Sequence, residues 1–322
     1  MATVIVHSAG LLTTVQDRGR YGYQRYGMPV SGAMDTFSLE LANLLVGNDP
    51  GDACLEATIS GPELEFTGST WIAITGADMD AHLNGQTIPM NTAVDIRPGD
   101  RLGFRGLRSG CRSYMAFLDG IAVPPVMGSR STYLRAGIGG FQGRALMPGD
   151  ELPLGGSDHI SSFDQLSTDT VKRKPKLMKL PAGLIPEYKH EQTIRVIPGP
   201  EAHYFEISGL RSFLPTEYSV TAQSDRMGYR LTGEPIRHKE GMTNILSAGI
   251  SMGTVQVPGD GQPIILMADR QTSGGYARIA NVITVDLTRL AQLRPGDIVR
   301  FREARLNTAL KLILRKECLR SD

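Results

Sequence analysis

The sequence predicts a mainly β protein made of two related halves. Short apolar and β-branched runs, each bounded by Gly, Pro, Asn or Asp, recur along the 322 residues. This pattern is typical of short strands joined by tight turns. The 37 Gly and 19 Pro also favour turns over long helices. Two sequence patterns of the first half return, in the same order, in the second half.

The strands and one hairpin follow from local composition. We expect strands at residues 4–6, 64–66, 71–75, 94–96, 194–197, 264–268 and 282–285. The pair Asn84-Gly85 predicts a two-residue hairpin turn, because both residues tolerate the positive φ that a type I′ turn requires.

Two helices are expected among these strands. Asp35 is placed to cap a helix that ends at Gly47 and carries Phe37 and Leu41 on one face. A second helix is expected over residues 303–319. Its apolar stripe would consist of Leu306, Leu310, Ile313 and Leu314.

The repeated patterns predict an internal duplication. Residues 96–104, which contain Pro98-Gly99-Asp100, match residues 293–301, and Arg20-Tyr21-Gly22-Tyr23 matches Arg226-Met227-Gly228-Tyr229. Pro-Gly-Asp is a common turn and occurs again at 148–150, so the two matches count only together. We expect domains at 1–155 and 193–322, joined by a polar linker over 156–192.

The bulk composition narrows the class of protein. Lys and Arg total 34 against 33 Asp and Glu, so the net charge of +1 argues against a nucleic-acid partner. Three cysteines far apart and six scattered histidines predict neither a disulfide framework nor a metal site. The sequence has no apolar run of about 20 residues and no signal-peptide pattern, which predicts a cytoplasmic protein without a membrane partner.

Of two well-known catalytic and nucleotide-binding motifs, one occurs in a misleading context and the other is absent from the sequence. The run Gly249-Ile250-Ser251-Met252-Gly253 matches the nucleophile elbow of hydrolases, which needs a strand before it and a helix after it. Here residues 254–257 predict a strand, so we interpret the match as coincidental. No Walker-type phosphate loop occurs, so ATP has no recognisable site in this chain.

The strongest candidate site lies in residues 253–276. An apolar strand there leads into a polar cluster and two adjacent glycines, Gly274 and Gly275. Backbone N–H groups at such glycines can stabilise a developing oxyanion, and the polar side chains supply directed contacts. The candidates are Gln256, Asp269, Arg270, Gln271, Thr272, Gly274, Gly275 and Tyr276.

The two arginine-containing repeats supply further candidates for substrate binding. Arg226 can grip a carboxylate through two N–H groups, and Tyr229 lies close to it in the sequence. Asp17 and Arg20 occupy the matching segment of the first half. A structural alternative stays open for both segments, in which the arginines pair with neighbouring carboxylates or pin a glycine-rich loop.

Long motifs across the chain resemble the biotin-dependent carboxyltransferase family, also called the allophanate hydrolase subunit 2 or KipA family. The resemblance covers about residues 4–301. It is carried by Gln16-Asp17-Arg18-Gly19-Arg20, Ser31-Gly32-Ala33-Met34-Asp35, Pro198-Gly199-Pro200, Ser224-Asp225-Arg226-Met227-Gly228-Tyr229 and Asp269-Arg270-Gln271-Thr272-Ser273-Gly274-Gly275-Tyr276.

The resemblance implies two cyclophilin-like β-barrel subdomains and a role in a complex. The implied partners are the A and B subunits of an ATP-dependent 5-oxoprolinase, of which the B protein is KipI-like. That complex opens the lactam of 5-oxo-L-proline to give L-glutamate. Gln256, Asp269 and Arg270 would then be catalytic. Gln256 would contact the substrate amide, because the urea carboxylase pattern has Asn at that position. Biotin is implied by the resemblance alone.

Two alternatives remain open. In one, the chain is a non-catalytic regulator that binds a KipI-like inhibitor of a kinase. In the other, it is the carboxyltransferase component of a urea-carboxylase-like system. The polar character of residues 269–276 argues against a pure binding interface, whose core is usually more apolar.

Overall fold

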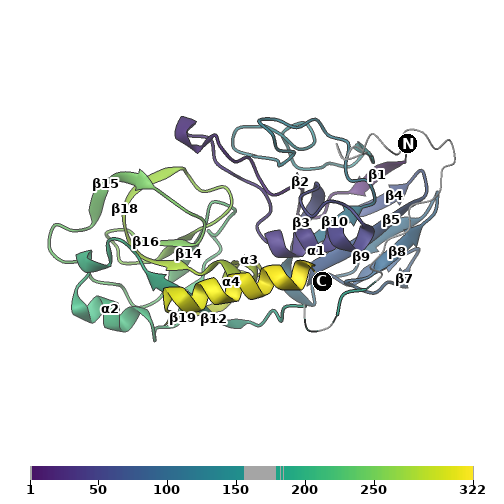
Figure 1. Cartoon of the computed structure of the whole chain (residues 1–322). Helices are drawn as coiled ribbons and strands as arrows, with labels where there is room; N and C mark the ends of the chain where they lie inside the picture. The colour runs from purple at the N-terminus through teal and green to yellow at the C-terminus, as the bar shows by residue number, and fades with distance from the viewer. Residues whose placement is uncertain (1, 156–178, 182, 184, 322) are drawn as a thin grey trace. The chain divides into compact units, whose positions relative to one another are not determined.

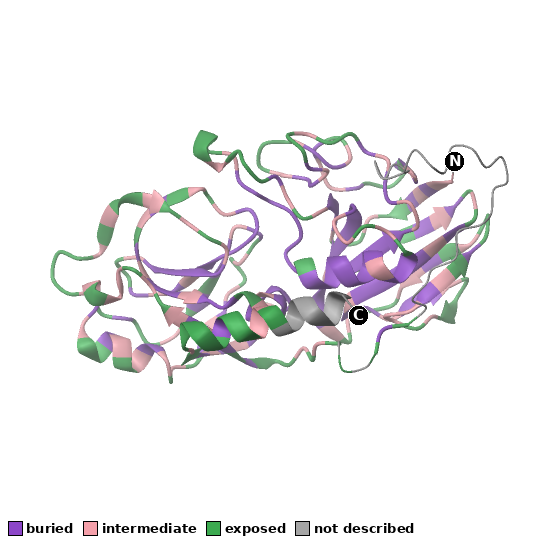
Figure 2. Ribbon diagram, in the orientation of Figure 1, coloured by how far each residue is buried: buried purple, intermediate pink, exposed green. Residues whose placement is uncertain are grey.

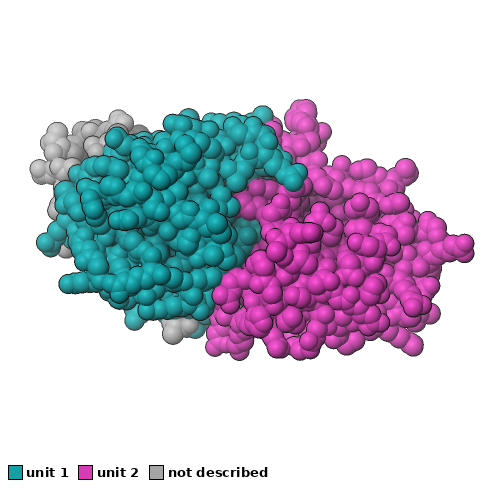
Figure 3. Space-filling model, turned by 180° about the vertical axis from the view of Figure 1, so that it is seen from behind, with its two compact units in different colours: residues 1–21, 31–186 teal, residues 22–30, 187–322 magenta. Residues whose placement is uncertain are grey.

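A computed structural model describes residues 2–155, 179–181, 183 and 185–321, which form two compact units (Figure 1). Unit 1 comprises Met1–Tyr21 and Ser31–Pro186, and unit 2 comprises Gly22–Val30 and Glu187–Asp322 (Figure 3). The sequence placed residues 22–30 in the first half, whereas this short segment belongs to unit 2. Most of the predicted linker lies outside the described residues, but its last two residues already belong to a strand that begins at Glu191.

Unit 1 is built from two sheets. The first has six strands in the order β11 (Glu151–Pro153), β1 (Thr3–Ser8), β4 (Glu63–Phe66), β9 (Arg101–Phe104), β6 (Ala81–Leu83) and β7 (Gln86–Thr87). The second has five strands in the order β2 (Leu12–Gln16), β3 (Cys54–Thr58), β10 (Ser109–Phe117), β5 (Thr70–Asp78) and β8 (Ala93–Ile96).

The core of unit 1 follows from the two-residue period of its strands. Alternate side chains of β10 face opposite sides of the second sheet. Met115 and Phe117 join Val4 and Leu64 of the first sheet in one buried cluster. Tyr114 and Ala116 instead face helix α1 (Thr36–Val46). The second sheet is therefore covered by apolar side chains on both faces. Figure 2 shows many residues of these strands as buried.

Helix α1 begins and ends as the sequence predicts. The Asp35 side chain accepts a hydrogen bond from the Ser38 N–H, and Gly47 ends the helix in the left-handed region with φ of 83°. The Asn-Gly hairpin is also confirmed. Asn84 and Gly85, with φ of 52° and 80°, connect β6 and β7.

Unit 2 is a seven-stranded barrel. Its strands follow the order β12 (Glu191–Pro198), β19 (Ile298–Glu303), β13 (Tyr218–Val220), β14 (Gly228–Thr232), β17 (Ile264–Leu266), β16 (Thr254–Val257) and β18 (Ser273–Val282). Pairing of β18 with β12 closes the barrel. The mainly β prediction is thus confirmed.

Strand β18 is long enough to pair with three neighbouring strands. Its C-terminal part pairs with β12, and its N-terminal part pairs with β15 (Asn244–Gly249). On its other edge it pairs with β16. The junctions of β15, β16 and β18 therefore lie at one place on the barrel, where the candidate site is found.

Some element boundaries differ from the predictions. Strand β17 ends at Leu266 rather than at 268, because Met267 and Ala268 belong to the loop that follows. The expected strand at 282–285 is wrong: β18 ends at Val282, and Thr284–Asp286 forms a 3₁₀ helix that leads into α3 (Leu287–Ala291). Branched residues alone did not reveal the helical turn.

The second expected helix exists but begins later and is less buried. Helix α4 spans Leu306–Ser321, because Glu303 still belongs to β19. Its predicted apolar stripe is largely exposed, with Leu306 at 59% and Leu314 at 65%, whereas Ala309 is buried. A shorter helix, α2 (Ile207–Phe213), precedes β13. Among the described residues, no helix is both long and apolar enough to cross a membrane.

Candidate functional site in the barrel of unit 2

A pocket of about 590 Å³ opens where β15, β16 and β18 meet. Polar side chains dominate the part of its wall that these strands and the 270–272 loop provide, and the described lining includes no Asp, Glu, His or Cys. The residues of this part of the wall are Ile250, Ser251, Thr254, Arg270, Gln271, Thr272, Arg278 and Asn281.

Arg278 is held rigidly at the pocket wall. Its Nε and Nη2 atoms donate to the two carboxylate oxygens of Glu201, both at 2.6 Å, and its Nη1 donates to the Gly249 carbonyl at 2.9 Å. This bidentate pair lowers the pKa of Glu201 below its ordinary value. Glu201 therefore keeps Arg278 charged and in place.

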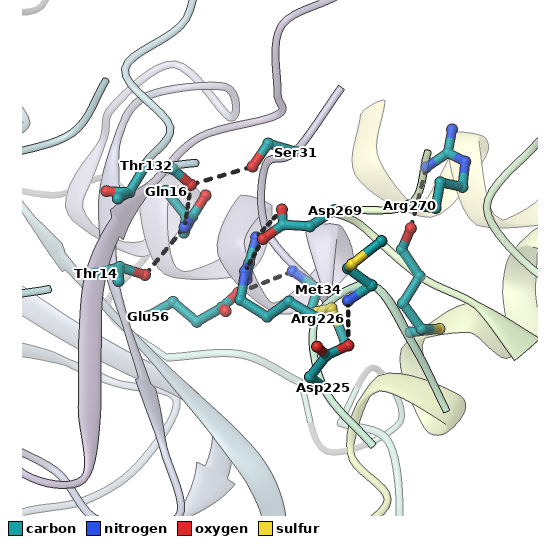
Figure 4. Close-up of polar contacts among 12 residues, drawn as sticks. Thr14, Gln16, Ser31, Met34, Glu56, Thr132, Asp225, Arg226, Asp269 and Arg270 are labelled. Carbon is teal, nitrogen blue, oxygen red and sulfur yellow. Dashed lines mark hydrogen bonds and ion pairs between the residues drawn. The ribbon is translucent and has the colours of Figure 1, made fainter. Parts of the chain in front are cut away.

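Arg270 forms the other cationic part of the wall. Its Nε donates to the Ile250 carbonyl and its Nη1 to the Met267 carbonyl, both at 3.3 Å. Figure 4 shows the Arg270 side chain and a contact that it makes to a main-chain oxygen. These bonds to main-chain oxygens orient the guanidinium group, whose planar set of donors suits a carboxylate or a carbonyl oxygen.

Ser251, Thr254 and Asn281 form a hydrogen-bonded chain along the same wall. The hydroxyls of Ser251 and Thr254 lie 3.0 Å apart, and Thr254 donates to the Asn281 side-chain oxygen at 2.8 Å. Thr254 is buried and Ser251 is exposed.

The predicted Gly274 lies behind this pocket in a crowded position. A Cβ atom at Gly274 would lie 2.5 Å from Ile250 Cδ1, 2.9 Å from Gln256 Nε2 and 3.0 Å from Gln271 Nε2. Only glycine leaves room for these three side chains. Gln256 itself is 2% exposed and donates to the Tyr276 carbonyl at 3.4 Å.

The glycine pair does not form the loop that the sequence analysis envisaged. Gly274 and Gly275 lie in β18, and Gly274 pairs with Ala248 of β15. Neither glycine has a positive φ. The expectation of a turn that presents free N–H groups is therefore corrected to an extended strand, in which glycine serves close packing. Tyr276 follows in the same strand and is 43% exposed.

Arg226 and Asp269 bind one another. Nε and Nη2 of Arg226 donate to the two carboxylate oxygens of Asp269 at 3.0 and 3.1 Å (Figure 4). Arg226 is 6% exposed and Asp269 is 5% exposed, and the Asp269 N–H donates to the Arg226 carbonyl at 2.8 Å. This pairing is of the kind that the structural alternative describes, and it joins the 225–228 loop to the loop that carries Arg270.

Tyr229, another predicted binding residue, is 2% exposed in β14. Its hydroxyl lies 3.2 Å from the Ala291 carbonyl oxygen and 3.4 Å from the Leu293 carbonyl oxygen, and these two acceptors share its single proton. These contacts connect the barrel wall to the end of α3.

In unit 1, Asp17 and Arg20 contact a single loop. The Asp17 carboxylate accepts from the Ser129 and Ser131 hydroxyls and from the Arg130 N–H. Arg20 is fully buried and donates to the Ser131 carbonyl at 2.6 Å and to the Val126 carbonyl at 3.2 Å. These contacts support the structural alternative, in which the two side chains hold a glycine-rich loop.

Unit 1 also contains a buried polar row that sequence patterns did not reveal. Thr14, Glu56, Tyr114 and Thr75 occupy paired positions across β2, β3, β10 and β5. Glu56 accepts from the Tyr114 hydroxyl at 2.7 Å and from the Met34 N–H at 2.8 Å, and the latter contact is visible in Figure 4. Burial raises the pKa of Tyr114 well above its ordinary value, so Tyr114 stays a neutral donor.

Three of the predicted site residues therefore line the pocket in unit 2: Arg270, Gln271 and Thr272. Sequence reasoning missed Thr254, Arg278 and Asn281 because they lie on strands whose pairing is a tertiary property. It noticed Ser251 only through the misleading hydrolase motif. In the structure the segment after Ser251 enters β16 rather than a helix, so the rejection of the elbow is confirmed.

A metal ion or a biotin-carrying lysine would require particular groups among the described residues. Among the described residues, no group of three or more His, Cys, Asp or Glu is arranged to hold a metal ion. A biotinyl lysine is usually presented at the tip of a tight hairpin. The run Met178-Lys179-Leu180 is faintly similar to the sequence around a biotinyl lysine. Lys179 instead forms an isolated β-bridge with Thr92, so it does not fit the role of a biotin carrier.

The fold and site define a known class. Residues 26–303 match the family model described as carboxyltransferase domain, subdomain A and B, and the chain belongs to this family. It is 41% identical to the C subunit of 5-oxoprolinase from Escherichia coli over 94% of this chain and 92% of that protein. It is 35% identical to the C subunit of 5-oxoprolinase from Haemophilus influenzae over 94% of this chain and 92% of that protein.

A solved structure shows the same fold inside a larger protein. The crystal structure of the Kluyveromyces lactis urea amidolyase matches 98% of this chain with a TM-score of 0.89 and 31% sequence identity. The match covers 19% of the urea amidolyase chain. That enzyme's activity therefore belongs to a much longer polypeptide.

Proposed function

We propose that this chain is the C subunit of an ATP-dependent 5-oxoprolinase and acts on the lactam of 5-oxo-L-proline within a complex. The observation that carries the proposal is the 41% identity with the Escherichia coli protein, which covers more than nine tenths of both chains. The likeness to the urea amidolyase, in contrast, covers only a small part of that protein.

The pocket in unit 2 is the proposed place of lactam binding. Arg270 and Arg278 supply cationic donors to a carbonyl or carboxylate oxygen, and Gln271 and Thr272 add uncharged polar groups. The described lining includes no carboxylate, imidazole or thiol that would serve as a general base. The pocket therefore fits binding and polarisation of the amide, with ATP used by the partner proteins.

Asp269 and Gln256 take supporting roles in this proposal. Asp269 holds Arg226, and this pair fixes the loop that leads to Arg270. Gln256 donates to the Tyr276 carbonyl, and both Gln256 and Gln271 pack close to Gly274, so Gln256 helps to hold this part of strand β18. The partners would be the A and B subunits of the complex, of which the B protein is KipI-like.

Reconstitution of the three-protein complex tests the proposal. Formation of glutamate from 5-oxo-L-proline and ATP should be lost when this chain is omitted. Unchanged turnover without it would contradict the proposal.

Two glycine variants connect the activity to the pocket. Gly274→Ala should lower kcat/KM by about tenfold or more, because the new methyl group displaces Ile250, Gln256 or Gln271. Gly275→Ala is the matched control on the same strand. Its Cβ would lie 3.5 Å from the Ile245 carbonyl, an ordinary contact, so it should retain nearly full activity. Nearly full activity in Gly274→Ala would contradict a role for this pocket.

A further inference from the structure

The Gly249–Gly253 match to a nucleophile elbow leaves Ser251 without an explanation. Ser251 is exposed, lines the pocket and follows β15 closely. A nucleophilic serine needs a neighbouring base, and no such group is found among the described lining residues. Ser251 therefore has a different use in this pocket.

The hydrogen-bonded chain determines which way the Ser251 hydroxyl points. Thr254 has one hydroxyl proton, and it donates this proton to the Asn281 side-chain oxygen. The 3.0 Å contact between Ser251 and Thr254 must then use the proton of Ser251. The Ser251 oxygen consequently keeps only acceptor lone pairs for the pocket.

The backbone around Ser251 is held by several bonds. Arg278 donates to the Gly249 carbonyl, Arg270 donates to the Ile250 carbonyl, and the Ile250 N–H donates to the Thr272 carbonyl at 3.1 Å. The Thr254 N–H also donates to the Ser251 carbonyl at 3.2 Å. These bonds hold Ser251 on the same wall as the two guanidinium groups.

We propose that Ser251 accepts a hydrogen bond from the N–H of a small cyclic amide, while the guanidinium groups bind the amide's carbonyl or carboxylate oxygens. This assignment rests on the proposed function and names a specificity-determining residue for it. An acceptor beside two cationic donors fits a lactam that carries an N–H donor together with carbonyl and carboxylate oxygens that accept hydrogen bonds. It disfavours the matching lactone, whose ring oxygen would face the Ser251 lone pairs.

Binding of a matched pair of probes tests this assignment. The probes are 5-oxo-L-proline and 5-oxotetrahydrofuran-2-carboxylate, in which a ring oxygen replaces the N–H. Dissociation constants would be measured by calorimetry on the full chain and as inhibition constants on the reconstituted complex. The wild type should prefer the lactam by about tenfold or more, because the lactone leaves a polar group unpaired.

Two variants separate the acceptor from a merely structural serine. Ser251→Ala should reduce the preference to about threefold or less, raising KM more than it lowers kcat. Thr254→Val should also reduce the preference although Ser251 is retained, because the Ser251 proton becomes free to serve the lactone oxygen. Ser247→Ala, on an exposed position of β15 outside the pocket lining, is the control and should keep the wild-type preference.

The outcomes distinguish this assignment from the proposed function. Unaltered preference in Ser251→Ala, or binding of neither probe by the wild type, would overturn the assignment. If Ser251→Ala loses all turnover but binds both probes as the wild type does, Ser251 is a nucleophile, and the assignment as an acceptor is overturned as well. If the wild-type complex binds the lactam selectively through Ser251 but does not open it, only the proposed function fails.

Discussion

The Pro-Gly-Asp turns of the two units are alike, whereas the two Arg-x-Gly-Tyr segments, of which the first crosses from unit 1 into unit 2 after Tyr21, are not. In unit 1, Gly99 has φ of 86° and Asp100 accepts from the Arg97 N–H at 2.7 Å. In unit 2, Gly296 has φ of 91° and Asp297 accepts from the Arg294 N–H at 2.8 Å. Each glycine N–H also donates to the carbonyl at the end of a neighbouring strand.

The arginine segments share a buried guanidinium, but its described partners and the backbone of the following glycine differ. Arg20 donates to two main-chain carbonyls, whereas Arg226 donates to the Asp269 carboxylate. Gly22 lies in a turn with φ of 91°, whereas Gly228 lies in strand β14. A pattern within four residues thus repeats its structure when its bonds are local. When its hydrogen bonds are to distant residues, those partners determine the conformation of the segment and the role of its arginine.

The largest expected difference is in the free energy of unfolding that is lost when either of the two arginines is replaced. Arg226→Met leaves the Asp269 carboxylate buried without its guanidinium, which should cost about 3–5 kcal/mol of unfolding free energy. Arg20→Met removes the hydrogen bonds to the Ser131 and Val126 carbonyls and should cost about 2 kcal/mol. Urea denaturation of both variants measures the two values. Equal losses would show that the carboxylate partner adds nothing to the burial of the arginine.

A smaller effect concerns the third Pro-Gly-Asp turn, in unit 1. Asp150 accepts from the Met147 N–H and pairs with Arg144, which holds the pKa of Asp150 below its ordinary value. A lowered folded-state pKa contributes stability that is present above the unfolded-state value of about 3.9 and is lost as pH falls through the folded-state value.

Asp150→Asn should therefore destabilise the protein by about 1–2 kcal/mol at neutral pH, and the difference from wild type should shrink in acid below about pH 4. Urea denaturation as a function of pH provides the measurement. Asp100→Asn, at the matching turn without Arg144, is the control and should show a smaller loss at neutral pH. A loss that persists unchanged in acid would rule out the ion pair as its cause.

The smallest effect tests whether the two matched turns are equivalent. Gly99→Ala and Gly296→Ala place a Cβ at a positive φ, although no atom lies within 4 Å of that Cβ at either site. Backbone strain alone should cost about 1 kcal/mol in each case. Thermal unfolding of the two variants measures the loss of stability in each. Unequal losses would mean that the surrounding unit affects the turn.

Local elements could be predicted from the sequence. The cap at Asp35, the left-handed Gly47, the Asn84-Gly85 hairpin and the repeated turns depend on bonds and dihedral angles within a few residues. The mainly β class followed from the same information. The boundary of α4 was misplaced because the strand before it continues to Glu303, and that extension depends on parallel pairing with β12.

Only part of the candidate site could be predicted from the sequence. The polar run 269–272 was visible in the sequence, and three of its residues line the pocket. The sequence suggests Asp269 as a catalytic residue, but it does not reveal the bond from Arg226 to Asp269, because these residues are 43 positions apart in the chain. Arg278 and Asn281 were missed for the same reason.

The sequence by itself determined most of the strands, the turns, the first helix and the polar composition of the site, because these depend on neighbouring residues. The tertiary structure alone decided that β18 closes the barrel on β12, that residues 22–30 belong to unit 2, and that Ser251 meets Thr254 and Asn281. These features require pairing between strands far apart in the chain, where the hydrogen bonds of one partner are set by the position of the other.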